Sequence, residues 1–117
     1  MRIYVGYDSR ENLAYEVCKY SIHKHNPDIE VIPIKLDTMR ELGIYTREVD
    51  KKASTEFTFS RFFVPYLMDY QGWALFVDCD FLFLSDPEEI FDLANKKYAV
   101  QVVKHDYKPK NTTKMDG

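Results

Sequence analysis

Cysteine, long apolar runs and an excess of charge of either sign are all scarce in this 117-residue sequence. Its two cysteines, Cys18 and Cys79, are too few for a disulfide scaffold, and we expect both to be free thiols. The longest apolar runs, WALFVD and FLFL, fall far short of the roughly 20 residues of a membrane-spanning helix. The net charge is −3 with both signs interspersed, so the composition does not favour nucleic acid or an anionic membrane as a partner.

Targeting and repeat signals are absent as well. The first residues, MRIYVGYD, have the pattern of a strand rather than that of a signal peptide, so we expect a cytoplasmic protein. What the sequence does contain is 45% hydrophobic residues, with 15% aromatic residues. This composition predicts one domain with a hydrophobic core over residues 1–117, in which the polar stretch 104–117 forms an irregular tail.

Hydrophobic periodicity and turn signals divide the chain into alternating strands and helices. The predicted strands are Arg2–Gly6, 29–36, 73–78 and 98–103. The first predicted helix runs to His25 from a cap at Asp8, which Glu11 is expected to close as a capping box. The second covers 59–70, with either a kink at Pro65 or a start nearer Arg61. The third begins at a cap by Asp86 with Pro87 at its first position and ends at about Ala94. Residues 37–53 are expected to form a loop or a short helical turn, and Pro33 places the second strand near a sheet edge.

This alternation predicts an α/β domain with a mainly parallel sheet. In such sheets, ligands bind beyond the carboxyl ends of the strands. Polar clusters follow two of the predicted strands, at Tyr7-Asp8-Ser9-Arg10 and at Asp78-Cys79-Asp80. We therefore expect the functional site to include these two clusters.

The segment WALFVDCDFLFLSD carries Asp78 and Asp80 in the middle of an apolar run. A buried carboxylate is costly unless it is paired, hydrogen-bonded or bound to a cation. In extended backbone both side chains point the same way, where their charges repel unless a cation lies between them. Mg²⁺ and Mn²⁺ prefer such oxygen sites, often together with substrate phosphates. The pair predicts a divalent-metal site on a diphosphate; the simpler interpretation is a turn capped by one aspartate.

Three segments resemble the nucleotide-sugar glycosyltransferases of the GT-A fold, close to family 8. They are IYVGYDSR at the start, FSRFFVPYL before the third predicted strand, and LFVDCDFLFLSDPEEIF around the aspartates. The resemblance implies a Rossmann-like domain with helices on both faces of the sheet. It also implies that a nucleoside-diphospho-sugar, above all a UDP-sugar, is bound through an Asp-x-Asp motif that holds Mn²⁺ (or Mg²⁺) on the diphosphate.

The resemblance implies roles for particular residues of this sequence. Asp78 and Asp80 would ligate the metal and so take part in catalysis. Tyr7 and Asp8 would contact the nucleoside, and Arg61 would reach the sugar or the diphosphate with a donor fork that suits both. The simpler interpretations are a surface aromatic for Tyr7, a helix cap for Asp8, a solvated helix face for Arg61, and a packing role for Cys79.

The resemblance further implies a longer protein, because transferases of this kind carry a second half with acceptor contacts and a late histidine that completes the metal shell. No apolar patterning follows Val103 in this sequence, and His105 is either a substitute ligand or a plain surface residue. We expect a glycosyltransferase domain that is incomplete by itself and acts on an unidentified acceptor. It would work with a missing C-terminal half or as a homo-oligomer.

Two other interpretations compete with a transferase. The chain is alternatively a non-catalytic domain that binds a nucleotide-sugar or a metal without transferring anything. A haloacid-dehalogenase-like phosphatase also places Asp-x-Asp after an apolar strand, with the first aspartate as nucleophile. That family has threonine or valine where this sequence has Leu82, and it usually begins with the motif, which disfavours this second alternative.

Overall fold

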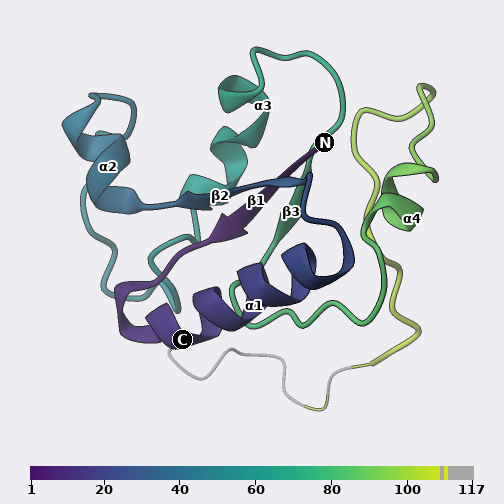
Figure 1. The fold of residues 1–117 in the computed structure, drawn as a ribbon. Helices are drawn as coiled ribbons and strands as arrows, with labels where there is room; N and C mark the ends of the chain where they lie inside the picture. Colours follow the sequence, from purple (N-terminus) through teal and green to yellow (C-terminus); the bar gives the residue numbers. More distant parts are fainter. Residues whose placement is uncertain (109, 111–117) are drawn as a thin grey trace.

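A parallel three-stranded sheet in the order β2–β1–β3 forms the centre of the protein (Figure 1). The structure is a computed structural model, and it describes residues 1–108 and 110 of the chain. The strands are β1 (Arg2–Gly6), β2 (Glu30–Ile34) and β3 (Leu75–Val77). Tyr4 of β1 is aligned with Ile32 of β2 on one side and with Phe76 of β3 on the other. The predicted parallel sheet and the edge position of the proline-containing second strand are both confirmed.

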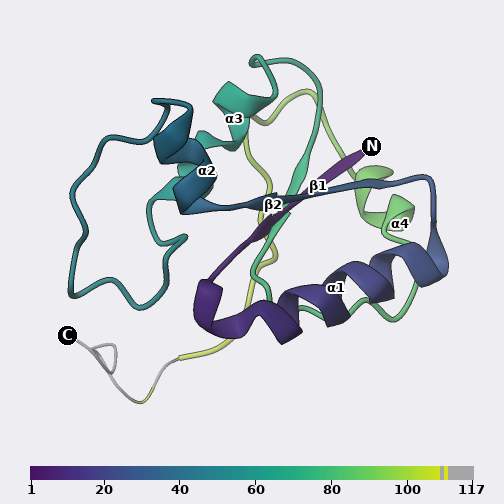
Figure 2. The same cartoon turned by 60° about the vertical axis from the view of Figure 1, so that its left-hand side comes forward.

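Helices cover both faces of the sheet, as predicted. The long α1 (Asn12–His25) crosses one face, while α2 (Leu36–Glu41) and α3 (Val64–Leu67) lie over the other (Figures 1 and 2). The remaining elements are the 3₁₀ turns η1 (Ser9–Glu11) and η2 (Ser60–Phe63) and the short α4 (Glu88–Phe91). The result is a small α/β domain compatible with a Rossmann-like fold. Among the described residues, no helix combines the length and apolar character that crossing a membrane requires.

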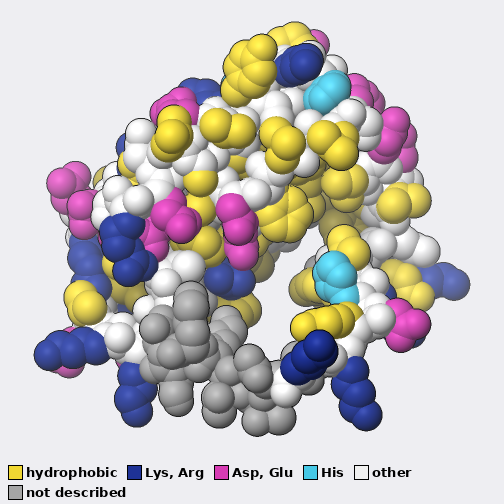
Figure 3. Space-filling view, turned by 90° about the horizontal axis from the view of Figure 1, so that it is seen from below, with side chains coloured by type: hydrophobic (Ala, Val, Ile, Leu, Met, Phe, Trp, Pro, Cys, Tyr) yellow, Lys and Arg dark blue, Asp and Glu magenta, His cyan; other side chains and the backbone are white. Residues whose placement is uncertain are grey.

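The predicted strand at 98–103 is wrong. Within residues 1–108 and 110, this segment has no strand partner, and all of its residues are exposed. Figure 3 shows a hollow between the rest of the molecule and the segment that leads to the grey residues. The strand predicted at 73–78 is shorter than expected, since β3 covers only Leu75–Val77. Within the described chain it pairs with β1 alone, so its other edge is uncovered. Residues 104–108 and 110 form no helix or strand, and the rest of the predicted tail lies outside the described residues.

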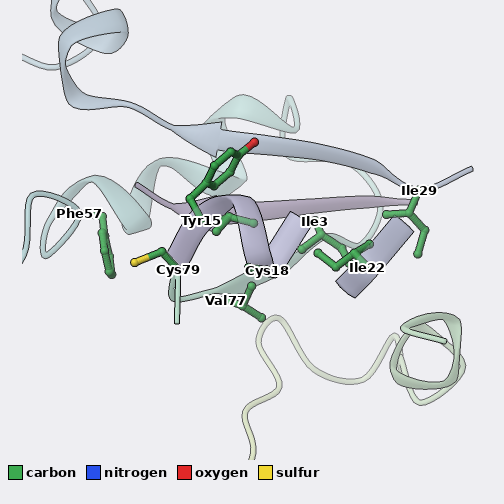
Figure 4. Packing of buried hydrophobic residues seen from close by; sticks show 9 residues of the cluster. Ile3, Tyr15, Cys18, Ile22, Ile29, Phe57, Val77 and Cys79 are labelled. Carbon is green, nitrogen blue, oxygen red and sulfur yellow. The ribbon is translucent and has the colours of Figure 1, made fainter. Parts of the chain in front are cut away.

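Two hydrophobic clusters hold the layers together. On the α1 face, Ile3 and Val5 of β1 pack with Cys18 and Ile22 of α1 and with Val77 of β3 (Figure 4). On the opposite face, Tyr4 packs in a second cluster whose other buried members are Ile34, Met39 and Tyr45. The strict alternation along β1 explains why one strand feeds both clusters. Both cysteines are free and buried, as predicted.

The helix predicted over 59–70 is shorter and less regular than expected. It consists of η2 followed by the single turn of α3, and the chain leaves it through Asp69 and Tyr70, whose φ angles are +53° and +57°. Pro65 lacks a backbone N–H, which is consistent with a change of helix type at this point. The helix predicted from 86 is also shorter, ending at Phe91, although Asp86 Oδ1 accepts from the Glu88 N–H at 2.9 Å as a cap should.

Candidate functional site

The carboxyl ends of β1 and β3 meet at one edge of the sheet. Because these strands are parallel neighbours, the residues that follow Gly6 and the residues that follow Val77 emerge on the same side. The two polar clusters predicted from the sequence, Tyr7-Asp8-Ser9-Arg10 and Asp78-Cys79-Asp80, therefore flank one edge.

Asp8 is the most tightly held residue of the site. Its side chain is 2% exposed and accepts a forked pair of bonds from Arg10, Nε to Oδ1 at 2.9 Å and Nη2 to Oδ2 at 2.7 Å. The backbone N–H groups of Arg10 and Glu56 donate to the same carboxylate at 3.0 and 3.2 Å. The Arg10 side chain is the main reason that the pKa of Asp8 falls to about 2.

Asp8 therefore joins two loops that are far apart in the sequence. It caps η1 as predicted, but the capping box is wrong, because Glu11 does not bond back to Asp8; its carboxylate instead accepts from the Cys79 thiol at 3.2 Å. The Ser9 N–H donates to Glu56 Oε2 at 2.9 Å and reinforces the same junction. Contact between Asp8 and a nucleoside stays a prediction, since both carboxylate oxygens already have internal donors.

The close approach of the loop at 55–57 depends on Gly6. A β-carbon built at Gly6 would lie 2.5 to 2.8 Å from the Phe57 ring, far inside contact distance. Phe57 is buried and belongs to the cluster on the α1 face. The absence of a side chain at Gly6 thus lets the Phe57 ring cover the end of β1, which brings Glu56 to Asp8.

Tyr7 presents an aromatic ring beside a positive charge. Its hydroxyl donates to Asn12 Oδ1 at 2.7 Å, and its ring meets the ring of Tyr15 edge-on with centroids 5.4 Å apart. The ammonium of Lys35, directly after β2, lies 4.8 Å from the Tyr7 ring centroid. These contacts fix the ring at the carboxyl edge while leaving it only partly buried.

Arg61 reaches the same edge from η2. Its guanidinium is 5.3 Å from the ring centroid of Phe57 and 5.5 Å from that of Phe76, and its Nε donates to the Phe57 carbonyl at 3.2 Å. Its Nη1 lies 3.8 Å from Oδ1 of Asp78. The structure therefore brings together two of the residues that the sequence singled out, and it presents the arginine fork toward the end of β3.

Asp78 and Asp80 lie in a turn rather than in extended backbone. β3 ends at Val77, and the Phe81 N–H donates to the Asp78 carbonyl at 3.3 Å. Strand alternation, the reason for expecting the two side chains on one face, does not apply to these positions. Cys79 between them is buried in the core cluster, which agrees with its predicted packing role.

The two aspartates have different surroundings. The Asp78 side chain is 44% exposed and faces Arg61. Asp80 is exposed at the lip of an open apolar groove of about 400 Å³, which is lined by Leu13, Ala14, Val17, Phe81 and Leu82. Within the described chain, neither side chain accepts a hydrogen bond, so their oxygens are open to a ligand. Whether both carboxylates hold one ion stays a prediction.

The donor set suits a weakly held oxygen-loving cation better than a closed metal centre. Among residues 1–108 and 110, no group of three or more histidine, cysteine, aspartate or glutamate residues is placed to hold a metal ion. A pair of accessible carboxylates matches Mg²⁺ or Mn²⁺, which keep water and take substrate phosphates as further ligands. Asp78 and Asp80 are accessible carboxylates of this kind, and a diphosphate would have to supply the rest of the shell.

Neither cysteine is suited to nucleophilic catalysis. Burial is the main cause that raises the pKa of Cys18 to about 11 and that of Cys79 to about 12, and the charge of Asp80 adds to both. A thiol with so high a pKa carries almost no thiolate at neutral pH. Both residues act in packing.

Sequence reasoning missed Lys35 and Glu56. Lys35 lies inside the predicted strand 29–36, although it is the first polar residue after the run EVIPI, a position that marks the end of the strand. Arg10 belongs to the polar cluster predicted after the first strand, but the sequence did not indicate that its side chain pairs with Asp8. Glu56 carried no signal, because its role depends on the long-range contact with Asp8 and Ser9.

Comparison with known proteins finds a relative whose name does not state a function. The chain matches no protein-family model, and no solved structure matches it. It is similar to "Protein CDI" of Arabidopsis thaliana, with 57% identity over 117 residues that make up 99% of this chain and 45% of that protein. The chain thus spans less than half the length of this curated relative, whose name states no activity.

Proposed function

We propose that this chain is the nucleotide-binding part of a glycosyltransferase that holds a nucleoside-diphospho-sugar, a UDP-sugar first, at the carboxyl edge of the sheet. The observation that carries the proposal is the meeting of the Tyr7 loop, the Asp78–Asp80 turn and Arg61 at that edge. The three segments on which the resemblance to GT-A transferases rests are the segments that supply these residues. Catalysis by this chain as a transferase is part of the proposal.

On the diphosphate side, Asp78 and Asp80 would hold Mn²⁺ or Mg²⁺ through their open oxygens. When bound, such a cation neutralises the charge that develops on a departing diphosphate. Arg61 would donate to the phosphate oxygens from its position beside Asp78, where its side chain is still 34% exposed. The stacking of its guanidinium over Phe57 and Phe76 orients the fork before the ligand arrives.

On the nucleoside side, the Tyr7 ring offers a stacking surface for a base, and Asn12 holds its hydroxyl. Lys35 adds a positive charge beside the ring. Asp8 would act mainly by fixing the loop that carries Tyr7, because Arg10 and Glu56 already occupy its oxygens. The acceptor side would come from outside these residues, from a further half of the protein or from a second copy.

A thermal-shift experiment tests the proposal. We would heat the protein with UDP, GDP or their sugars, with and without Mn²⁺, and compare wild type with Asp80→Asn. A bound ligand at a hundredfold excess over its dissociation constant stabilises the native state by about 2.7 kcal/mol. We expect stabilisation by UDP that needs Mn²⁺ and that Asp80→Asn abolishes. Asp92→Asn is the matched control, because Asp92 is also an exposed carboxylate but follows α4.

The same preparation separates a transferase from a non-catalytic binder. A working site should release UDP slowly from its UDP-sugar when only water is present as acceptor, whereas a binding module should bind and release the sugar intact. Nucleotide stabilisation that is independent of metal, or that Asp80→Asn leaves unchanged, would contradict the assignment of the aspartates.

A further inference from the structure

Residues 98–103, named here the C-terminal arm, expose an unusual amount of apolar surface. Tyr98 is 57% exposed, Val100 74%, Val102 84% and Val103 78%. Valine and tyrosine favour strands because they pack well on a half-buried pleated surface. The arm has that composition, yet within the described chain it has no strand partner.

The arm is nevertheless held in place through Gln101. Gln101 Oε1 accepts from the Asn95 N–H at 2.7 Å, and Gln101 Nε2 donates to the Leu93 carbonyl at 3.1 Å. These bonds fasten the arm to the turn that follows α4. The arm therefore has a defined position without any support from the sheet.

The free edge of β3 faces the same region. β3 lies at the end of the strand order and, among the described residues, pairs only with β1. Figures 1 and 2 place the C-terminal arm on the β3 side of the sheet, and Figure 3 shows the hollow that separates this part of the chain from the rest. An unpaired strand edge is a template for another strand, and native proteins normally cover or charge it.

We propose that an extended segment with an apolar face inserts between β3 and the C-terminal arm and so joins both into one larger sheet. The occupant that we propose is a segment equivalent to one that lies outside the matched region of the Arabidopsis relative. The matched region is only 45% of that protein, so the relative has further sequence that could supply such a segment. Backbone hydrogen bonds to β3 would give the affinity, and the exposed valines of the arm would give the apolar contact. This proposal does not depend on the proposed function.

Hydrogen exchange measured by mass spectrometry tests it. The chain alone is compared with a chimera in which this chain replaces the matched region of the full-length Arabidopsis relative, and with that relative itself. We expect the amide hydrogens of 98–103 to exchange without protection in the chain alone and at least ~100-fold more slowly in both longer proteins. Protection of β1, which lies in the centre of the sheet, reports in each sample that the domain is folded.

Three results would overturn the proposal. One is fast exchange at 98–103 in the full-length relative, at the aligned residues, while its β1 is protected. Another is fast exchange at 98–103 in a chimera whose β1 is protected. The third is protection of 98–103 in the chain alone that rises with protein concentration, which would make a second copy the occupant.

A pair of substitutions locates the contact. In the chimera, Val100→Lys combined with Val102→Lys should restore fast exchange in β3 and in the arm, because charge replaces the apolar contact. Leu42→Lys is the matched control, since Leu42 is 68% exposed after α2, away from the arm, and it should leave the exchange of both segments unchanged. Unchanged protection in the double variant would show that the arm does not contact the occupant.

Discussion

Arg61 Nη1 lies 3.8 Å from Asp78 Oδ1 and links η2 to the carboxyl end of β3 across 17 positions of sequence. The Arg61 and Asp78 side chains are 34% and 44% exposed. Solvent therefore screens the pair, and its contribution to folding is small. Its consequence lies in binding, because a donor fork and an open carboxylate stand side by side at the edge where we place the diphosphate.

Replacing Arg61 should weaken nucleotide binding. We expect Arg61→Gln to raise the dissociation constant for UDP in the presence of Mn²⁺ by about tenfold, or ~1.4 kcal/mol, through loss of charge-assisted bonds to phosphate. Arg61→Lys should give a smaller effect, since it keeps the charge but loses the fork. Isothermal titration measures both. Arg40→Gln is the control, because Arg40 also stacks on an aromatic ring, that of Tyr45, but lies on α2; an equal effect there would refute a specific role for Arg61.

Asp8 should make folding sensitive to acid. Its pKa is lowered to about 2 in the folded protein, chiefly by the Arg10 side chain, from an ordinary value of 3.8. A depressed folded-state pKa stabilises the protein above the unfolded-state pKa, and this stabilisation is lost as pH falls from about 4 through about 2. The difference is about 2 kcal/mol.

Asparagine at position 8 isolates this contribution, because it resembles the protonated acid. We expect Asp8→Asn to be less stable than wild type by about 2 kcal/mol at pH 6 in urea unfolding, with the gap closing between pH 4 and pH 2. A gap that stays constant with pH would mean that the carboxylate charge is not what the Arg10 contact stabilises.

The contact between Gly6 and Phe57 predicts strong coupling between the two positions. Gly6→Ala should destabilise the fold by roughly 1–3 kcal/mol, because the new methyl group overlaps a buried ring. In a Phe57→Ala background the same change should cost much less, so a double-mutant cycle should show a large coupling energy. Additive effects in chemical denaturation would show that the loop at 55–57 does not press on the end of β1.

Replacing Ser60 with alanine should not lower the stability of the fold. Its hydroxyl is buried and, in the part of the chain that the structure describes, has no hydrogen-bond partner. Ser60→Ala should therefore leave the free energy of unfolding within about 0.5 kcal/mol of wild type or raise it. Ser21→Ala should lower it by about 1 kcal/mol, because Ser21 Oγ donates to the Cys18 carbonyl at 2.7 Å and accepts from the Phe83 N–H at 3.0 Å. An equal loss of stability in both variants would contradict the conclusion that the Ser60 hydroxyl lacks a hydrogen-bond partner.

Features set by local sequence were predicted well. The apolar run at Arg2–Gly6, the helical spacing up to His25 and the edge position of Pro33 each follow from a few adjacent residues. The cap by Asp86 is of the same kind. In these cases the pattern and the physical cause lie within one segment.

Features that depend on distant partners were not predictable. The segment 98–103 has the composition of a strand, but strand formation requires a neighbour, and the described chain provides none. The sequence presented Asp8 as a nucleoside contact or a helix cap and did not indicate its bond to the Glu56 N–H, which joins loops 48 positions apart. The candidate site shows the same division: its residue types were visible in the sequence, whereas the approach of Arg61 to Asp78 and of Lys35 to Tyr7 required the fold.

The most direct measurement is electron paramagnetic resonance of Mn²⁺ titrated into the protein with and without UDP. Free Mn²⁺ gives a sharp signal that disappears on binding, so the bound fraction is counted directly. We predict tight binding of one Mn²⁺ only when UDP is present, retained in Asp92→Asn and lost in both Asp78→Asn and Asp80→Asn. Mn²⁺ binding that ignores UDP, or that survives loss of either carboxylate, would contradict the account.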